Sequence, residues 1–587
     1  MQRMGWVLCL GAMMAMHTAP VFAEDESGRY VDVAEMNRIA EQVDIDLARE
    51  TDPAGFVQYR TLALAFTSAE TYANPFSDVR LHAVIRGPEG TEHRVDGFYD
   101  GDGAWRIRYC PLAPGEYVYT TACSNADDAG LHGKSGAFTV AAAPADEPNP
   151  LYRHGGSLRV SPNGRYLTYH DGTPFYWLGD TWWFVPTQDH PYEGSSTERF
   201  KSMYQLTTRL RREQGYSVIQ CAFLGAKPAF DAAGEHEKAV FLKPERWTEE
   251  ATAFWRQADR YFLYANHSGF VMSIGLLWTW DLEHLGWKAE DVAEAFRYVQ
   301  ARYGSYSIVW YVVAEYNAVS PEITQEHIRV AAKLREFDPY KTRPMTIMPW
   351  PPYMAGKEAW DEPWFGFTLL QGGHFREPGQ VMPRNHHWDA YQREGRTLPV
   401  IVGEENFERI YDKENDDGDV RAAAYRAMLC GACGFTYGAT GLWYPNRDDD
   451  HRVDWHWGNA AWYRALDYPG GKQMGLMRKL FESFAWWELT PDPKGIVEEG
   501  YPQEWDVPVM ARNGDDLILV YLPPNTPKDR PVLSRRIPVT DAYRARFYDV
   551  RTGAFVDAPA CVADGDAVRL PDRPSDGDWV LVLEKRE

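Results

Sequence analysis

The central part of the chain alternates strand-like and helix-like segments, and this alternation limits the possible folds more than any other feature. Between about residues 151 and 489, short apolar runs are separated by longer segments with the apolar spacing of a helix. Eight such units predict parallel strands joined by helices, which favours a closed (β/α)8 TIM barrel. The predicted strands are 175–179, 217–224, 270–277, 307–314, 343–348, 365–371, 398–403 and 433–439. The predicted helices are 196–214, 249–265, 289–303, 321–337, 384–394 and 418–431, with a weaker pattern at 354–361 and a long one at 459–487.

The segments on both sides of this barrel have a different pattern. In residues 54–142, apolar and polar positions alternate in short runs between Gly and Pro turns, which predicts an N-terminal antiparallel β-sandwich. The same pattern returns in residues 490–587 and predicts a small C-terminal β-domain, again of the sandwich type. Residues 141–150 (AAAPADEPNP) have the composition of a linker. We therefore expect a multidomain protein with a barrel of residues 151–489 at its centre.

The amino terminus has the pattern of a cleavable signal peptide. Residues 1–23 contain Arg3, an apolar run from Trp6 to Met16 and a small residue, Ala23, before an acidic one. This pattern predicts a secreted or periplasmic protein. No later segment has the roughly 18 consecutive apolar residues that a membrane-spanning helix needs, so we expect no membrane partner.

Charge and aromatic content narrow the class of ligand. The formal net charge of −23 argues against nucleic acid as a partner, because binding to phosphates needs clustered Lys and Arg. The chain contains 23 Trp, 34 Tyr and 26 Phe, and aromatic faces can stack on the C–H faces of sugar rings. Composition thus favours a carbohydrate ligand, and it leaves the oligomeric state open.

The cysteine positions do not predict a definite set of disulfide bonds. Cys110 and Cys123 flank a predicted hairpin turn at residues 113–115, and in an exported protein they could be bonded or free. Cys430 and Cys433 have the spacing of a redox motif, but they lie at a predicted helix-to-strand junction without a second such pair. For this pair we expect packing of small residues.

Two glutamates are candidate catalytic groups, Glu315 in SIVWYVVAEYN and Glu404 in LPVIVGEENFE. Each stands at the carboxyl end of a predicted strand, the fourth and the seventh, where barrel enzymes carry their chemistry. In retaining glycosidases two such carboxyls face each other about 5 to 5.5 Å apart. We expect Glu315 to be the acid/base and Glu404 the nucleophile. The alternative is that either acid merely pairs with an Arg or Lys of the barrel.

Other residues at the strand ends are candidates for substrate binding. Glu405 and Glu408 compete with Glu404 for the second catalytic role, but we expect the later residues to turn outward. Asp180 follows the first strand beside Trp182 and Trp183, and its carboxylate could bind sugar hydroxyls or anchor a loop. The full set of predicted substrate-binding residues is Asp180, Trp182, Trp183, Trp278, Trp280, Asn317, His374, Glu405 and Trp443.

Other chemistries have weaker support in the sequence. The hexapeptide 451–456 (HRVDWH) lacks the HExxH spacing that places two imidazoles on one helical face. Residues 133–135 (GKS) resemble the end of a phosphate loop, but position 128 is Asp where the first glycine should stand. Neither a nucleophile-elbow motif nor a dinucleotide fingerprint is present. We expect no metal and no cofactor.

Several motifs resemble those of the apiosidase-like glycoside hydrolases. They are residues 174–183 (PFYWLGDTWW), 308–315, 403–408 and 434–443 (GFTYGATGLW), and residues 466–489 resemble the closing helix of that family. The resemblance implies a (β/α)8 hydrolase with acids after strands four and seven. Residues 54–142 are similar to the β-sandwich that precedes such barrels, and the tail is similar to a small β-domain named for collagen binding. Apiosidases have an aspartate in a Gly-Gly-Asp context where this chain has Ala314-Glu315, so apiose specificity does not carry over.

The sequence therefore predicts a secreted, retaining, metal-independent glycoside hydrolase that acts on a polysaccharide or oligosaccharide. The alternative is a non-catalytic carbohydrate-binding protein built on a barrel scaffold. The identity of the sugar, its linkage and the choice between internal and terminal cleavage stay open at this level.

Overall fold

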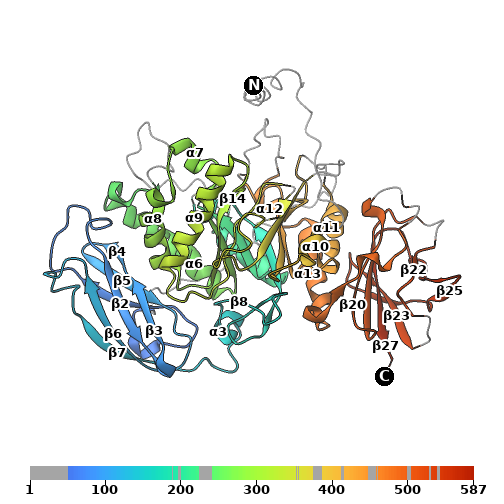
Figure 1. Ribbon diagram of the computed structural model, residues 1–587, viewed down its shortest axis with the longest axis horizontal. Helices are drawn as coiled ribbons and strands as arrows, with labels where there is room; N and C mark the ends of the chain where they lie inside the picture. Colours follow the sequence, from blue (N-terminus) through green and yellow to red (C-terminus); the bar gives the residue numbers. More distant parts are fainter. Residues whose placement is uncertain are drawn as a thin grey trace, which may run out of the picture.

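The computed structural model places three β-rich bodies in a row, with the amino-terminal body at one end and the carboxyl-terminal body at the other (Figure 1). The predicted signal peptide, residues 1–23, and the hexapeptide 451–456 lie outside the described part of the chain. The structure describes residues 50–187, 189–195, 200–223, 241–351, 353–354, 356–374, 386–411, 415–446, 458, 460–498, 501, 504–527, 531–538 and 542–586.

The amino-terminal body consists of two antiparallel sheets. Along one strand, β2 (Leu81–Arg86), Leu81, Ala83 and Ile85 are buried while the residues between them are partly exposed, so one face of this sheet packs inward. One sheet has the order β1 (Leu62–Thr67), β5 (Ala104–Tyr109), β4 (Phe98–Gly101), and the other has the order β3 (Glu92–Asp96), β2, β6 (Gly115–Cys123), β7 (Ser135–Val140).

Cys110 and Cys123 are both buried and unbonded, like every cysteine in the described residues. The predicted hairpin between them does not form, because β5 and β6 belong to different sheets. Cys123 instead pairs across its sheet with Leu81. Cys430 and Cys433 are also buried and form no disulfide within the described residues, in keeping with the expected packing role.

The central body is built on seven parallel strands, with helices between them. Neighbouring strands in this sheet are also neighbours along the chain, except where β11 pairs with β18 and so brings the first and last strands together. A short eighth strand, β15 (Tyr353–Met354), pairs antiparallel with β16. The parallel strands, in spatial order, are β14 (Ile308–Ala314), β13 (Val271–Trp278), β12 (Val218–Ala222), β11 (Trp177–Thr181), β18 (Gly434–Tyr437), β17 (Val400–Glu405) and β16 (Thr368–Gly373).

The predicted fifth strand, 343–348, does not form a regular strand. Met345 instead makes isolated parallel bridges to Trp310 on one side and to Phe365 on the other. Backbone hydrogen bonds support both contacts, since the N–H of Thr346 donates to Trp310 O over 2.9 Å and that of Gly366 to Met345 O over 2.7 Å. Pro344 and Pro349 bracket this segment and lack the N–H that a longer ladder would need. The segment therefore lies between β14 and the residues just before β16, and it is bound to each by a single bridge.

The helices follow the predicted pattern with two exceptions. The structure has α4 (Met203–Glu213), α6 (Glu250–His267), α8 (Ala289–Tyr303), α9 (Pro321–Phe337), α10 (His386–Tyr391) and α11 (Asp417–Leu429). The weak pattern at 354–361 is not a helix, because residues 356–361 form turns. The long pattern at 459–487 is divided into α12 (Trp462–Ala465) and α13 (Pro469–Glu482). Pro469 explains the division, since a proline is accepted in the first turn of a helix but disfavours helix in the residue before it. None of the helices in the described residues is long and apolar enough to cross a membrane.

The carboxyl-terminal body has two antiparallel sheets and an apolar core of its own, which includes Met510, Ile518 and Leu581. The larger sheet has the order β19 (Thr490–Pro491), β20 (Val509–Asn513), β21 (Leu517–Leu522), β27 (Trp579–Lys585), β23 (Tyr543–Asp549), β24 (Phe555–Asp557). The smaller one has the order β22 (Leu533–Ser534), β26 (Ala567–Arg569), β25 (Val562–Asp564).

Buried ion pairs join the central body to both neighbours. On the amino-terminal side, Asp259 of α6 accepts from Arg108 of β5 over 2.8 Å and from Arg302 over 2.6 Å. On the other side, Arg421 of α11 makes a bidentate pair with Asp578, with distances of 2.8 and 2.9 Å. Since buried charges must be paired, these contacts fix each flanking body against the central one.

Candidate active site

Glu315 and Glu404 come together at the carboxyl ends of β14 and β17. Gln371, on β16, lies next to both: its backbone stands opposite Glu404 in the β16–β17 register, and its side-chain Nε2 donates to Oε1 of Glu315 over 3.3 Å. Glu315 is 8% exposed and Glu404 is 7% exposed. Glu315 has a φ of 52°, in the left-handed region that costs energy for a residue with a side chain. This turn directly follows β14, so it sets the direction of the carboxyl.

The surroundings of Glu315 favour its protonated form. Burial is the largest cause, the nearby charge of Glu404 is the second, and together they raise the pKa of Glu315 to about 8. The hydrogen bond from Gln371 acts in the opposite direction. At neutral pH Glu315 therefore holds a proton that it can donate.

His374 is hydrogen-bonded to Glu404. Its Nε2 lies 2.8 Å from Oε1 of Glu404, and its Nδ1 accepts the backbone N–H of Phe407 over 3.2 Å. Because Nδ1 accepts, Nε2 carries the ring proton and donates it to the carboxylate. The carbonyl of His374 also accepts from Asn415 over 2.8 Å. His374, which we predicted to bind substrate, thus contacts the candidate nucleophile Glu404.

Glu405 and Glu408, which we expect to turn outward from the site, are both shielded from solvent. Glu405 is still part of β17, is 5% exposed, and lies 3.2 Å from Nε2 of His387. Glu408 is 1% exposed and accepts from the hydroxyl of Tyr437 over 2.6 Å and from the N–H of Gly470 over 3.2 Å. Burial raises the pKa of Glu408 to about 7. Both carboxyls have other partners, and the carboxyl whose charge acts on Glu315 is that of Glu404.

Asp180 does not have the surface that a sugar contact requires. Every residue of β11 is buried, and the Asp180 carboxylate accepts from Nε of Arg211 over 2.6 Å, with both side chains fully buried. Trp182 is also fully buried, and its ring stacks on His190. The alternative reading of Asp180 as an internal anchor is therefore the one that fits the structure, and the prediction that Asp180 and Trp182 bind sugar is corrected.

The remaining predicted residues lie at this end of the strands with differing exposure. Trp183 is only 4% exposed. The centroid of its ring lies 6.0 Å from that of Trp278, which is half-buried. Trp443 is half-buried against Phe407. Asn317 accepts the backbone N–H of Trp350 over 2.7 Å. Trp280, with 37% of its surface exposed, is the most open of the set.

Three further residues were not predicted: Gln371 and His387, which contact Glu315 and Glu405, and Trp350, which contacts Asn317. Gln371 was detectable, since a polar side chain at the end of an apolar strand is the signal that selected Glu315 and Glu404. His387 acts through Glu405 from the separate helix α10, and Trp350 follows the irregular fifth segment. No pattern in the neighbouring sequence indicates a functional role for either His387 or Trp350. The described residues hold no cluster of three or more His, Cys, Asp or Glu that could bind a metal ion.

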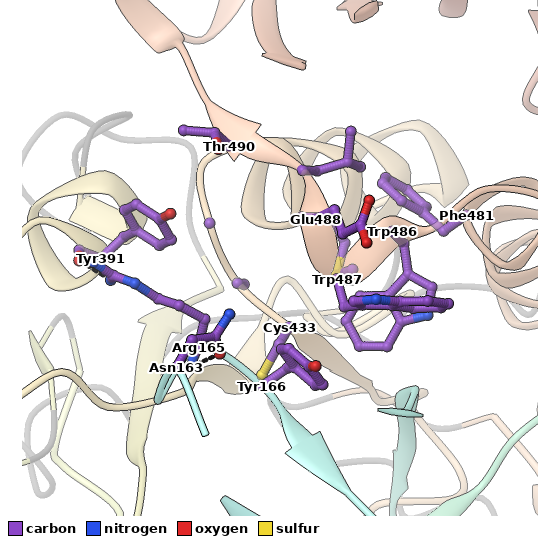
Figure 2. A pocket seen from close by; sticks show the side chains of 14 residues that line it. Asn163, Arg165, Tyr166, Tyr391, Cys433, Phe481, Trp486, Trp487, Glu488 and Thr490 are labelled. Carbon is purple, nitrogen blue, oxygen red and sulfur yellow. Dashed lines mark hydrogen bonds between the residues drawn. The ribbon is translucent and has the colours of Figure 1, made fainter. Parts of the chain in front are cut away.

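A cavity of about 320 Å³ lies at the opposite end of the central body. Its wall includes Cys433, which directly precedes β18, so it opens at the amino end of that strand. Figure 2 shows Tyr391 on one side of the cavity, the two rings of Trp486 and Trp487 on the other, and Arg165 between them. Because the two glutamates stand at the carboxyl ends of their strands, this cavity is not the place of their chemistry.

The chain is similar to known proteins in its central and amino-terminal parts. Residues 161–488 match the model of the family described as "Apiosidase-like, catalytic domain", and residues 56–124 match a domain of unknown function, DUF5060. No curated protein matches the chain.

Solved structures show the same fold. One is described as a glycoside hydrolase and is 22% identical, with a TM-score of 0.59, over 73% of this chain and 96% of the other. A glycoside hydrolase family 5 structure from Bacteroides vulgatus ATCC 8482 is also 22% identical, with a TM-score of 0.59, over 73% of this chain and 93% of the other. A proposed glycoside hydrolase from the same strain is 20% identical, with a TM-score of 0.62, over 90% of this chain and 99% of the other.

Proposed function

Because the chain belongs to the apiosidase-like catalytic domain family and is a glycoside hydrolase, we propose that it cleaves its carbohydrate by retaining double displacement between Glu404 and Glu315. The observation that carries this proposal is the nearness of the two buried acids, since Gln371 donates to Glu315 and stands opposite Glu404 in the strand register. A non-catalytic binding protein would have no use for a buried, protonated glutamate beside a second carboxyl.

In the first step Glu404 attacks the anomeric carbon while Glu315 gives its proton to the departing glycosidic oxygen. The raised pKa of Glu315 suits this role, since the proton is still present at neutral pH. In the second step Glu315, now ionised, takes a proton from water as the water attacks the glycosyl ester of Glu404. The charge of Glu404 disappears when the ester forms, which lowers the pKa of Glu315 and prepares it to act as a base.

His374 orients the nucleophile in this mechanism. Its Nε2–H bond fixes one oxygen of Glu404, so the other oxygen is the one that attacks.

We further infer that the seven parallel strands and the Met345 segment form a closed (β/α)8 barrel. The bridges of Met345 to Trp310 on one side and to Phe365 on the other support this closure.

The signal-like amino terminus supports export, so the mature protein is expected to begin near Glu24. Mass spectrometry of the protein recovered outside the cytoplasm tests this second point.

A screen of aryl glycosides and polysaccharides, followed by NMR of the first-formed anomer, tests the function. Retention is expected, and an inverted product would overturn the role of Glu404, because inverting carboxyls stand about 6.5 to 9.5 Å apart.

Two glutamate substitutions test the nucleophile. Glu404→Gln should abolish turnover. Glu322 is exposed in the first turn of α9, so Glu322→Gln should leave turnover unchanged. In Glu315→Ala, azide should restore the second step and give a glycosyl azide of retained configuration.

A further inference from the structure

Two tryptophans form an exposed pair at the carboxyl ends of the strands. Trp280 is 37% exposed and Trp350 is 39% exposed, whereas most tryptophans in the described chain are buried or half-buried. Their ring centroids lie 6.3 Å apart, with an angle of 71° between the ring planes. Leaving two large apolar rings in water costs free energy, so an exposed pair of this kind is typical of a binding surface.

The backbone on each side of the pair is held in place. The N–H of Trp350 donates to Oδ1 of Asn317 over 2.7 Å. On the other loop, the N–H of Trp278 donates to Oδ2 of Asp281 over 2.7 Å, and Asp281 begins helix α7 (Asp281–Leu285) directly after Trp280. The pair is therefore organised before any ligand arrives, which reduces the entropy that binding would cost.

The pair stands on the Glu315 side of the site. Trp278 is in register with Ala314, the residue before Glu315, and Asn317 lies two residues after it. The loops that carry Trp280 and Trp350 follow the two segments on either side of β14, which are β13 and the Met345 segment. Glu404 approaches from the other direction, on β17 beyond β16.

This asymmetry distinguishes the two ends of a substrate. The acid protonates the oxygen of the leaving group, so the leaving group extends from the bond on the side of the acid. Resting on the mechanism proposed above, we propose that Trp280 and Trp350 bind a sugar of the leaving group. The substrate is accordingly an oligosaccharide or polysaccharide cut between two sugar units, and a glycoside of a small non-sugar alcohol would not use the pair.

The same surface must then also bind a sugar that acts as the acceptor when the glycosyl ester of Glu404 is broken. A sugar hydroxyl attacks the anomeric carbon of the glycosyl ester, the bond to Glu404 breaks, and ionised Glu315 takes the hydroxyl proton. Transglycosylation is thus a second readout of the pair, independent of how tightly the donor binds.

Trp280→Ala and Trp350→Ala test this with two substrates that share one glycone, an oligosaccharide and a dinitrophenyl glycoside. The kcat/KM for the oligosaccharide should fall about tenfold or more, while that for the dinitrophenyl glycoside should stay within about twofold. The yield of transglycosylation to an added oligosaccharide should fall in parallel. Phe555→Ala, which removes a ring that is 40% exposed in the carboxyl-terminal body, is the matched control and should change neither.

An equal fall for both substrates, or no fall for either, would overturn the assignment of the pair to the leaving group. The proposed mechanism is judged separately, because it fails if Glu404→Gln still hydrolyses the dinitrophenyl glycoside or if the first-formed anomer is inverted. If that variant is inactive and the tryptophan variants behave like wild type, the mechanism stands and the inference about the pair does not.

Discussion

Nε2 of His374 lies 2.8 Å from Oε1 of Glu404, while Nδ1 of the same ring accepts the backbone N–H of Phe407. The second contact fixes the tautomer, so the imidazole donates to the carboxylate and cannot take a proton from it. His374 comes from the residue after β16 and Glu404 from β17, so this bond also ties together the ends of two neighbouring strands. The nucleophile is held by a neutral donor.

Removing that donor should lower kcat more than it raises KM. In His374→Ala one oxygen of Glu404 loses its partner, and the loss of a hydrogen bond to a charged group corresponds to a fall in kcat of about 10- to 100-fold. His374→Gln keeps an N–H donor and should recover part of the rate. A loss confined to stability, with kcat and KM of the folded protein unchanged, would contradict the positioning role.

The pH dependence of hydrolysis should report the proton of Glu315. Since burial and the charge of Glu404 raise the pKa of Glu315 to about 8, kcat/KM should fall as the pH rises through about 8. Glu315→Gln should lose this alkaline limb. Its residual rate should depend strongly on the leaving group, because a good leaving group such as dinitrophenolate does not need the proton. Steady-state kinetics from pH 5 to 10 with two aryl glycosides of different leaving-group acidity measure both effects.

Gln371 should shift that alkaline limb in a defined direction. Its Nε2 donates to Glu315, which favours the ionised form and lowers the pKa. Gln371→Met removes the donor at similar volume, so the alkaline limb should move to higher pH even if the maximal rate decreases. A movement to lower pH would show that Gln371 acts on Glu315 in some other way.

The site was predictable to the extent that it depends on strand ends. Glu315 directly follows β14 and Glu404 lies near the carboxyl end of β17, so the periodic pattern of the sequence correctly placed both candidate acids at strand ends. Asp180 gave the same local signal and yet turns to Arg211, because the partner lies on α4 and no local pattern reveals it. The prediction of a fifth strand was wrong for a related reason. Its apolar residues have the pattern of a strand, but the flanking prolines Pro344 and Pro349 limit its pairing to single bridges.

The same buried carboxyl should make stability depend on pH. The native pKa of Glu315, about 8, lies above the value of about 4.3 for an unfolded chain. Between these two values the native state holds a proton that the unfolded state has lost, so the contribution of Glu315 is fully present below about pH 4 and disappears as the pH passes 8. Glu315→Gln should therefore gain stability relative to wild type as the pH rises from 4 to 8. Urea unfolding at several pH values measures this, and the exposed Glu290→Gln should give a flat difference.

Asp180 and Arg211 should matter for stability rather than for substrate binding. Both side chains are fully buried and 2.6 Å apart, so Asp180→Asn leaves the guanidinium of Arg211 without its counter-charge. Breaking one partner of a buried pair costs about 3 to 5 kcal/mol, which urea unfolding can resolve. The fraction that remains folded should show a KM close to that of wild type. The double variant Asp180→Leu with Arg211→Met removes both charges and should be less destabilised than Asp180→Asn alone. A large rise in KM at unchanged stability would restore the sugar-binding reading that the burial of Asp180 argues against.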